Sequence, residues 1–577
     1  MPYLRRYKNA LIGSAAFLIF SELLGFFATT LVRDAIDSLD PEIETLFSVK
    51  TYAALILGAA CLQAGARFVS RYMMGWSSSR IEYAMRNRFF EHLLTLDPAY
   101  FARQNVGDLL ARAVNDLNAV RLMLGRTLIF AASAALRIPI GLAFLFSIDW
   151  RLALASLAPF LALPPVMARM STRIHTYFEQ IQEQFAQMNS MARESFTGVR
   201  IVKAYLREES ESRRFSEMND VYVKRNQRLI QFESLIFPII LFIPGVSAAI
   251  ALWLGGWGVA SRAITFGQFT QFNYILIMLT FPMAIFGFTW SSAQRAAASM
   301  GRLSEILSAS PTVSDAEQIQ LPEPSIQGEI AFRNLTFRYD EEDERPPALL
   351  DVNLRIPAGT TAAVVGPTGS GKSSLVSLIP RLRQADEGSV LIDGRDVRSY
   401  SLEHLRSHIG FVQQESFLFS DSVADNLRFG DPEADGEAMK NAAEAAHLLQ
   451  EIEGFSDGFD TELGERGATV SGGQRQRTSI ARALLRKPRI LILDDAFASV
   501  DTHTEEAILH NLRGGLVDTT VVMISHRVST VQDAGKIFVL DEGRLVEEGT
   551  HEELIAQGGF YANLHEKQRL QDELAEL

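Results

Sequence analysis

The sequence predicts a multidomain membrane protein in which an all-α domain of six transmembrane helices precedes an α/β domain. Two observations support this fold class. Nearly all the long apolar runs lie in the first half of the 577-residue chain, and short apolar runs of strand length alternate with helical ones in the second half. We expect a membrane domain over residues 1–308, a proline-bearing linker over 309–325 and an α/β domain over 326–577.

Six apolar segments are long enough to cross a bilayer, which takes about 20 residues in a helix. They cover residues 10–32, 52–74, 127–147, 152–168, 235–259 and 266–290. Only a short turn, residues 148–151, separates the third segment from the fourth, so these two predict a helical hairpin. An even number of spans returns the chain to the side of the membrane on which it starts.

The charges that flank these segments predict the orientation. Arg5, Arg6 and Lys8 precede the first span, and residues 75–126 are rich in arginine, whereas the segment after the first span is acidic. Because Lys and Arg concentrate in cytoplasmic loops, we expect a multi-pass protein of the cytoplasmic (inner) membrane, with its N-terminus and its α/β domain in the cytoplasm. The first apolar run is longer than the core of a secretory signal, which predicts a retained span.

The two cytoplasmic connections, residues 75–126 and 169–234, show helical periodicity and contain few Pro or Gly residues. We therefore expect the membrane helices to continue far into the cytoplasm. Breaks at residues 105–108 and 197–198 predict the points where the helices reverse, with short helices at the tips.

A glycine-rich segment follows the predicted strand 361–365 and precedes a helix, as a phosphate-binding loop requires. Its residues are Gly366, Pro367, Thr368, Gly369, Ser370, Gly371, Lys372, Ser373 and Ser374. Backbone N–H groups of such a loop surround phosphates, Lys372 reaches the β and γ phosphates, and Ser373 binds Mg²⁺. The alternative, a chance glycine-rich turn, does not explain the strand and helix on either side.

The apolar strand 490–493 ends in a carboxylate, Asp494, which predicts a group that holds Mg²⁺ through water beside the phosphate loop. Many buried strands end in Asp, so a strand that ends in Asp494 indicates a Mg²⁺ site only because the glycine-rich loop precedes it in the sequence. Together the two motifs predict ATP and Mg²⁺ as cofactors.

Residues 470–477, Val-Ser-Gly-Gly-Gln-Arg-Gln-Arg, resemble the signature motif of ATP-binding cassette (ABC) proteins. This resemblance covers essentially the whole chain, because six spans before a cassette are similar to an exporter half-transporter. Further positions match in order and spacing: Tyr339 for adenine stacking, Gln414 for catalysis and Mg²⁺, Glu465-Arg466-Gly467 before the signature, Asp501 for the D-loop and His526 for contact with the γ-phosphate. Taken alone, each of these would be an ordinary strand-edge or loop residue.

The resemblance implies a dimer in which two cassettes stack head to tail. Each ATP then lies between the phosphate loop of one chain and the signature of the other, so Ser471, Gly472, Gly473 and Gln474 serve the partner's nucleotide. The resemblance also implies that cytoplasmic tips, expected near residues 106–115 and 196–203, couple the cassettes to the spans.

One position departs from the family pattern. The catalytic glutamate that follows the Mg²⁺ aspartate is replaced by Asp495, whose side chain is shorter by one methylene. We expect firm ATP binding and slow hydrolysis at this site. The change resembles the degenerate-site subunit of heterodimeric multidrug or lipid exporters, whose partner half-transporter keeps the glutamate. A homodimer that works with aspartate, and a regulatory subunit whose own ATP site is silent, remain alternatives.

Two ionisable residues lie about halfway along predicted spans, where a charge is costly unless it is paired or faces a wet cavity. They are Glu22 in the first span and Arg137 in the third. They are candidates for the substrate path, and an ion pair that only fixes helix packing is the alternative. We expect a small amphipathic or hydrophobic cargo, such as a drug, lipid or peptide, and contact with membrane lipid, but no nucleic-acid partner.

Overall fold

The computed structural model describes residues 2–40, 43, 46–315, 324–339, 346–464, 467, 469–516 and 518–575, without the side chains of residues 2, 3, 164, 284–288, 572, 574 and 575. The chain divides into two compact units. The helical unit comprises Met1–Leu94 and Asn105–Ala309, and the α/β unit comprises Thr95–Gln104 and Ser310–Leu577.

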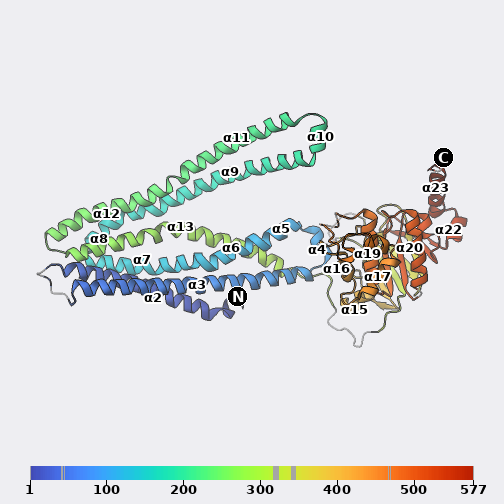
Figure 1. The fold of residues 1–577 in the computed structure, drawn as a ribbon, viewed down its shortest axis with the longest axis horizontal. Coiled ribbons are helices and arrows are strands. Elements are labelled where there is room, and N and C mark those ends of the chain that lie inside the picture. The colour runs from blue at the N-terminus through green and yellow to red at the C-terminus, as the bar shows by residue number, and fades with distance from the viewer. Residues whose placement is uncertain are drawn as a thin grey trace. The chain divides into compact units, whose positions relative to one another are not determined.

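The helical unit consists of long helices (Figure 1). After α1 (Pro2–Arg6), α2 (Lys8–Asp37) and α3 (Val49–Thr95), the chain follows α5 (Val106–Ala111), η1 (Arg112–Asp116), α6 (Leu117–Leu122), η2 (Met123–Thr127) and α7 (Leu128–Ile148) as one helical run. The next run consists of α8 (Trp150–Leu157), η3 (Ala158–Ala162) and α9 (Leu163–Thr197), and the unit ends with α10 (Val199–Ala204), α11 (Glu208–Glu233), α12 (Ile236–Ala260) and α13 (Phe266–Ser308).

Five helical runs of the described chain are long and apolar enough to cross a membrane. They are Lys8–Asp37, Val49–Thr95, Val106–Ile148, Trp150–Thr197 and Glu208–Ala260, and each contains one of the first five predicted segments. The sixth predicted segment lies within α13, where the side chains of residues 284–288 fall outside the description, so this span stays a prediction.

The predicted hairpin between the third and fourth segments is confirmed. Asp149 caps α8 by accepting hydrogen bonds from Arg151 N at 2.8 Å and Leu152 N at 2.9 Å. A capping carboxylate at this position satisfies N–H groups that have no partner inside the helix. The chain therefore reverses directly between α7 and α8.

The two predicted tips each carry a short helix, but the first lies earlier than predicted. It is α4 (Pro98–Arg103), which Asp97 caps, and Asn105 then caps the returning helix α5. Residues 106–115 are therefore not a tip, because they form the start of the long helical run. The second short helix, α10, lies where the break at Gly198 predicts it and joins the neighbouring helices α9 and α11 (Figure 1).

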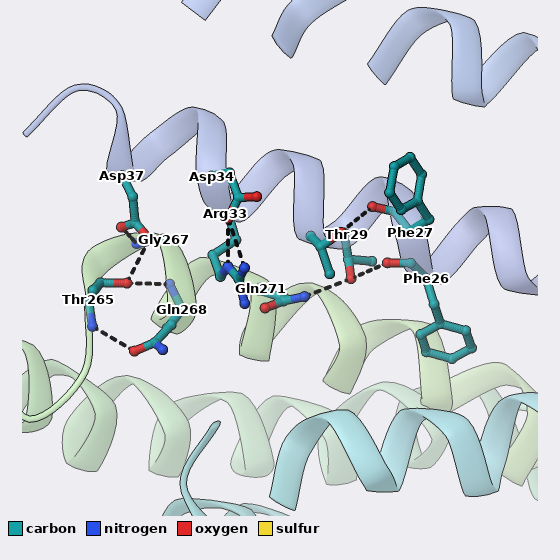
Figure 2. A network of polar contacts seen from close by, with 11 residues as sticks. Phe26, Phe27, Thr29, Arg33, Asp34, Asp37, Thr265, Gly267, Gln268 and Gln271 are labelled. Atoms are coloured by element: carbon teal, nitrogen blue, oxygen red, sulfur yellow. Dashed lines mark hydrogen bonds and ion pairs between the residues drawn. The ribbon is translucent and has the colours of Figure 1, made fainter. Parts of the chain in front are cut away.

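Polar contacts join α2 to the start of α13 (Figure 2). The buried carboxylate of Asp37 accepts hydrogen bonds from Thr265 Oγ1 and Gly267 N, both at 2.9 Å. One and a half turns further on, Gln271 Nε2 donates to Thr29 Oγ1 at 3.1 Å. Gln271 thus joins two helices, as polar side chains within membrane spans commonly do.

Cys61, which its apolar surroundings predict to be packed, is instead exposed in this chain. It lies on α3, much of whose surface is uncovered within the helical unit.

The α/β unit contains two sheets. A four-stranded antiparallel sheet has the order β2-β1-β4-β5, with β1 (Ile330–Phe337), β2 (Leu349–Ile356), β4 (Val390–Ile392) and β5 (Arg395–Asp396). A six-stranded sheet has the order β10-β9-β3-β8-β7-β6, with β3 (Thr361–Val365), β6 (Ile409–Val412), β7 (Ile490–Asp494), β8 (Thr520–Ile524), β9 (Lys536–Asp541) and β10 (Arg544–Gly549).

The helices of this unit lie between and after the strands of the two sheets along the chain. They are α14 (Lys372–Leu378), η4 (Val397–Ser399), α15 (Leu402–Ser407), α16 (Val423–Arg428), α17 (Gly436–Ala445), α18 (Leu449–Glu453), η5 (Gly458–Asp460), α19 (Gly472–Leu485), α20 (Thr502–Gly515), α21 (Val528–Val531), α22 (His551–Gln557) and α23 (Phe560–Ala575).

In the larger sheet, all strands from β9 to β6 are parallel, and only β10 is antiparallel. The strands read as nearly unbroken apolar runs, because both faces of the sheet are buried. Parallel strands end at a common edge, where ligands of α/β proteins bind. The predicted, mainly parallel sheet is therefore present, and its carboxyl edge is the place to look for the site.

Candidate functional site

Four predicted motifs meet at the carboxyl edge of the six-stranded sheet. The glycine-rich loop follows β3, Gln414 comes two residues after β6, Asp494 ends β7 and His526 comes two residues after β8. The strands β3, β8, β7 and β6 are consecutive neighbours. The fold thus gathers residues that lie as far as 160 positions apart in the sequence onto one edge.

The loop Gly366–Ser374 has the backbone of a phosphate cradle. Gly366, Gly369 and Gly371 all have positive φ values, of 149°, 86° and 97°. A Cβ atom added to Gly371 would lie 2.5 Å from Ala348 O, and one added to Gly366 would lie 2.0 Å from Leu540 O. These positions require glycine, both for the dihedral angle and for the close approach of another main chain.

The ammonium group of Lys372 lies against this loop. Its Nζ donates to the carbonyl oxygens of Gly366 at 3.0 Å and Pro367 at 2.8 Å. Burial lowers the pKa of Lys372, and the nearby carboxylates of Asp495 and Asp494 oppose that shift. The cation is therefore held beside the place where a phosphate would lie.

Ser373 and Asp494 form the pair that the two motifs predict. Ser373 Oγ donates to Asp494 Oδ1 at 3.0 Å. Burial raises the pKa of Asp494, the hydrogen bond from Ser373 opposes this shift, and the adjacent Asp495 adds to it. A hydroxyl and a carboxylate side by side are oxygen ligands of the kind Mg²⁺ takes next to phosphates, so these residues fit a metal-nucleotide site.

Asp495 turns the chain sharply after β7. Its φ is +48°, an uncommon value for a residue other than glycine, and its N–H donates to Ile524 O at the end of β8 at 3.0 Å. Its side chain is partly exposed, whereas that of Asp494 is buried. A strained backbone at a strand end is typical of functional sites.

His526 is exposed, and its charge lowers the pKa of Asp494, which places it on the same edge. The main chain around it is held by Gln568 from the C-terminal helix α23. Gln568 Nε2 donates to His526 O at 2.6 Å, and Gln568 Oε1 accepts from Val528 N at 2.8 Å. The sequence analysis missed Gln568, and no local motif around this residue identifies it.

Tyr339 lies next to the phosphate loop. Its hydroxyl hydrogen-bonds to Ser374 Oγ at 2.6 Å, and the guanidinium of Arg383 lies 4.4 Å from the centre of its ring. Half of the Tyr339 side chain is exposed, so its position is compatible with the predicted stacking on adenine. Gln414 is exposed and makes no hydrogen bond within the described part of the chain.

The signature segment forms the start of α19 instead of joining the loop. Ser471 and Gln474 make a reciprocal capping box, with Gln474 N bonded to Ser471 Oγ at 3.2 Å and Ser471 N to Gln474 Oε1 at 2.8 Å. Gly472 and Gly473 allow close approach of Ser499, since a Cβ on Gly473 would lie 2.9 Å from Ser499 O. Among the described residues, no hydrogen bond joins this segment to the phosphate loop.

Asp501 caps α20 by accepting from Thr504 N at 2.9 Å, and this hydrogen bond lowers its pKa. The side chain of Asp501 is exposed, so this residue caps the helix and is also accessible from solvent. Glu465 and Arg466, which are predicted to precede the signature, lie outside the described residues.

In the helical unit, Glu22 and Arg137 form an ion pair between Glu22 Oε2 and Arg137 Nε. Ser133 Oγ donates to Glu22 Oε1 at 2.8 Å, and Arg67 Nη2 lies 3.8 Å from the same oxygen. The sequence analysis missed Arg67, although it is an ionisable residue inside the second predicted span and meets the criterion that selected the other two.

Comparison with known families assigns both units. A family model described as "ABC transporter transmembrane region" matches residues 10–283, and one described as "ABC transporter" matches residues 349–498. The chain belongs to the ABC transporter family. The ABC domain implies ATP binding, and the chain is an ABC ATPase coupled to transport.

Relatives of this ABC transporter cover nearly its whole length. The probable multidrug resistance ABC transporter ATP-binding/permease protein YheI of Bacillus subtilis is 33% identical over 574 residues, which cover 98% of this chain and 96% of the relative. The multidrug resistance-like ATP-binding protein MdlA of Escherichia coli is 32% identical over 570 residues (99% and 96%). The ATP-dependent lipid A-core flippase of Vibrio cholerae is 32% identical over 566 residues (98% and 96%).

A solved structure of a bacterial Atm1-family ABC exporter with ATP bound matches the chain with a TM-score of 0.79 at 25% sequence identity. The match covers 98% of this chain and 99% of that one. This ABC transporter is thus a multi-pass exporter half-transporter, with a helical membrane domain before a nucleotide-binding domain. The predicted fold class is confirmed.

Proposed function

We propose that this exporter works as an asymmetric dimer, in which the ATP bound to its own phosphate loop is hydrolysed slowly and the partner's site supplies most of the turnover. The observation that carries the proposal is Asp495, which directly follows Asp494, the last residue of strand β7. The aspartate resembles the degenerate site of heterodimeric ABC exporters, and we propose that the partner half-transporter of this chain keeps the glutamate.

Catalysis of hydrolysis by residue 495 depends on whether its carboxylate reaches the attacking water. A general base has to lie within hydrogen-bond distance of the water that attacks the γ-phosphate. An aspartate is about 1 Å shorter than a glutamate, and a misplacement of that size costs about a hundredfold in rate. The backbone of Asp495 is fixed by its bond to Ile524 O, so the main chain has little freedom to compensate for the missing methylene.

The other side chains of the site are of the kinds that bind ATP and Mg²⁺. Lys372 is placed to reach the β and γ phosphates, and Ser373 and Asp494 would hold Mg²⁺, with Gln414 as a further ligand. The metal would neutralise phosphate charge, and His526 would contact the γ-phosphate. This combination supports firm ATP binding without rapid hydrolysis at the same site.

The signature supports a role in the partner's site. Ser471 lies at the exposed start of α19, and its capping box fixes the orientation of the first helical turn. In a head-to-tail dimer, the residues Ser471, Gly472, Gly473 and Gln474 would contact the γ-phosphate held by the partner chain. This chain would thereby complete the faster site. Asp501 would lie at the same interface.

The cargo we propose is an amphipathic or hydrophobic molecule, moved out of the cytoplasm or between leaflets of the inner membrane. The names of the relatives support this, since they describe multidrug resistance proteins and a lipid A-core flippase. The short helices α4 and α10 at the tips of the cytoplasmic extensions are the segments we propose to transmit closure of the cassettes to the spans.

Steady-state ATP hydrolysis tests the asymmetry. The chain is purified alone and together with a candidate half-transporter, each with Asp495, Asp495→Glu and Asp495→Asn. The proposal predicts that the chain alone is nearly inactive, that the pair is active, and that Asp495→Asn hardly changes the rate of the pair. Brisk turnover by the chain alone that Asp495→Asn abolishes would instead establish a homodimer with aspartate as its base.

A further inference from the structure

A cluster of arginines surrounds the buried carboxylate in the helical unit. A cavity of about 160 Å³ is lined by Arg67 and Arg71 of α3, Arg137 of α7 and Glu22 of α2. One carboxylate faces three guanidinium groups, which leaves two positive charges unbalanced in the lining. Among the cavity's lining residues, Glu22 is the only acidic side chain.

The carboxylate of Glu22 already has partners within the helical unit. Glu22 is 1% exposed, and its two oxygens are bonded to Arg137 and Ser133, with Arg67 at 3.8 Å. The side chain of Arg67 remains 33% exposed, and Arg71 is exposed. A charge within a span is costly unless it is neutralised. These two cations are therefore available to an anion that enters the cavity.

The rest of the lining is apolar on one side. Leu18 and Ile129 lie in the wall together with Phe130 and Phe281, whose rings are 6.3 Å apart. Arg67 and Arg71 also border a second hollow of about 530 Å³, which is an open stretch of the surface of α3 because all its lining residues, Phe68 and Tyr72 among them, belong to that helix. The first cavity is smaller than the 300 to 1,000 Å³, roughly, of a pocket for a whole drug-sized ligand. It has room for a charged head group, while the second hollow offers apolar surface for a tail.

We infer that the cargo of this exporter is an amphipathic anion whose phosphate, sulfonate or carboxylate group is bound by Arg67 and Arg71. This inference rests on the proposed export function and specifies the class of its substrate. Arginine suits such a ligand because its planar fork donates two parallel hydrogen bonds to an oxyanion and stays charged when partly buried. Glu22 holds Arg137 in place and competes with the ligand for Arg67.

Equilibrium binding to the assembled transporter tests the inference. The protein is reconstituted in nanodiscs of phosphatidylcholine without ATP, and binding of radiolabelled dodecyl phosphate is measured, with dodecyltrimethylammonium of equal chain length as competitor. Both amphiphiles partition into lipid, so the dissociation constants of variant and wild type are compared in the same discs. Because no ATP is present, the result does not depend on which site hydrolyses it.

We expect saturable binding that the cationic amphiphile does not displace. Arg67→Gln and Arg71→Gln should each weaken binding about tenfold, the loss expected for one charge-assisted contact. Arg88→Gln is the matched control, because Arg88 is an exposed arginine further along α3 and outside both hollows, and it should leave binding unchanged. Glu22→Gln should strengthen binding several-fold, whereas a purely structural ion pair would make the same substitution weaken it.

Two sources of the anion are separated by adding phosphatidylglycerol to the discs. Competition by this lipid identifies a lipid phosphate as the bound group, and its absence identifies a soluble amphipathic anion. Either outcome supports an anion site. Equal affinity of the wild type, Arg67→Gln, Arg71→Gln and Arg88→Gln for dodecyl phosphate, or displacement by dodecyltrimethylammonium, would overturn it. Basal ATPase activity and the elution volume of each variant establish that it is folded.

Discussion

Replacing Gly371 by alanine tests whether the phosphate loop needs the backbone described above. Gly371 has a φ of 97° and precedes Lys372, the first residue of α14. An L-residue in the left-handed region costs about 1–2 kcal/mol, which corresponds to a factor of about 5 to 30 in an equilibrium constant. The added Cβ would also lie 2.5 Å from the main-chain oxygen of Ala348, where ordinary contacts begin at 3.4 Å.

The matched control is Gly369→Ala in the same loop. Gly369 has a similar φ of 86°, but a Cβ atom there meets nothing within 4 Å. Both variants carry the dihedral cost, and only Gly371→Ala forces the loop away from Ala348, by about 1 Å if normal contact is to be restored. The difference between the two variants therefore measures the effect of the close approach.

The assay is equilibrium binding of a fluorescent ATP analogue to the full-length protein, together with its melting temperature without nucleotide. We expect Gly369→Ala to weaken binding about 5- to 30-fold and Gly371→Ala to weaken it at least tenfold more, and we expect both to lower the melting temperature, with the larger decrease for Gly371→Ala. Equal effects of the two substitutions on both readouts would refute the steric argument.

Three further predictions concern other contacts. Asp97→Asn should lower the melting temperature, because Thr312 N donates to this carboxylate at 2.7 Å and such a bond contributes about 1–2 kcal/mol. Burial tends to raise the pKa of Asp97, but the hydrogen bonds from Thr312 outweigh this effect and the pKa is lowered. The difference in melting temperature between Asp97→Asn and the wild type should therefore persist from pH 8 to 5 and shrink only as the pH falls through that lowered pKa. Gly267→Ala should lower the melting temperature because its Cβ would lie 2.3 Å from Arg33 O, whereas Gly256→Ala, whose Cβ meets nothing within 4 Å, should not. Asp494→Asn should remove the gain in ATP affinity that Mg²⁺ gives to this chain's own site while ATP binding in EDTA persists, and an unchanged Mg²⁺ dependence of ATP binding to the chain alone would contradict the role of Asp494 as a metal ligand.

Much of the nucleotide site could be predicted from sequence, because its motifs are local. The loop Gly366–Ser374, the strand that ends at Asp494 and the strand before His526 each carry their own pattern of apolar and special residues. Parallel strands then bring these ends together without further information. The strand bounds agree to within one residue for β3 and β7.

The features that the sequence analysis missed depend on contacts between distant segments. Gln568 hydrogen-bonds to the backbone of His526, 42 positions away in the sequence. A single glutamine on an exposed helix has no sequence pattern that predicts such a contact. The first tip was misplaced because Asn105 is both a plausible break and a helix cap, and only the structure distinguishes the short helix that starts at Pro98. Arg67 meets the criterion that selected Glu22 and Arg137, and only its proximity to Glu22 required the structure.

The most direct test of slow hydrolysis at Asp495 is to identify the nucleotide that this site retains during turnover. The assembled transporter is supplied with radiolabelled Mg-ATP, chased with unlabelled ATP and quenched, and the ratio of labelled ATP to ADP that stays bound is measured for Asp495 and Asp495→Glu. We predict that one labelled ATP per dimer remains intact with Asp495 and is converted to ADP with glutamate. Labelled ADP, or no retained nucleotide, with the native Asp495 would contradict a slow site.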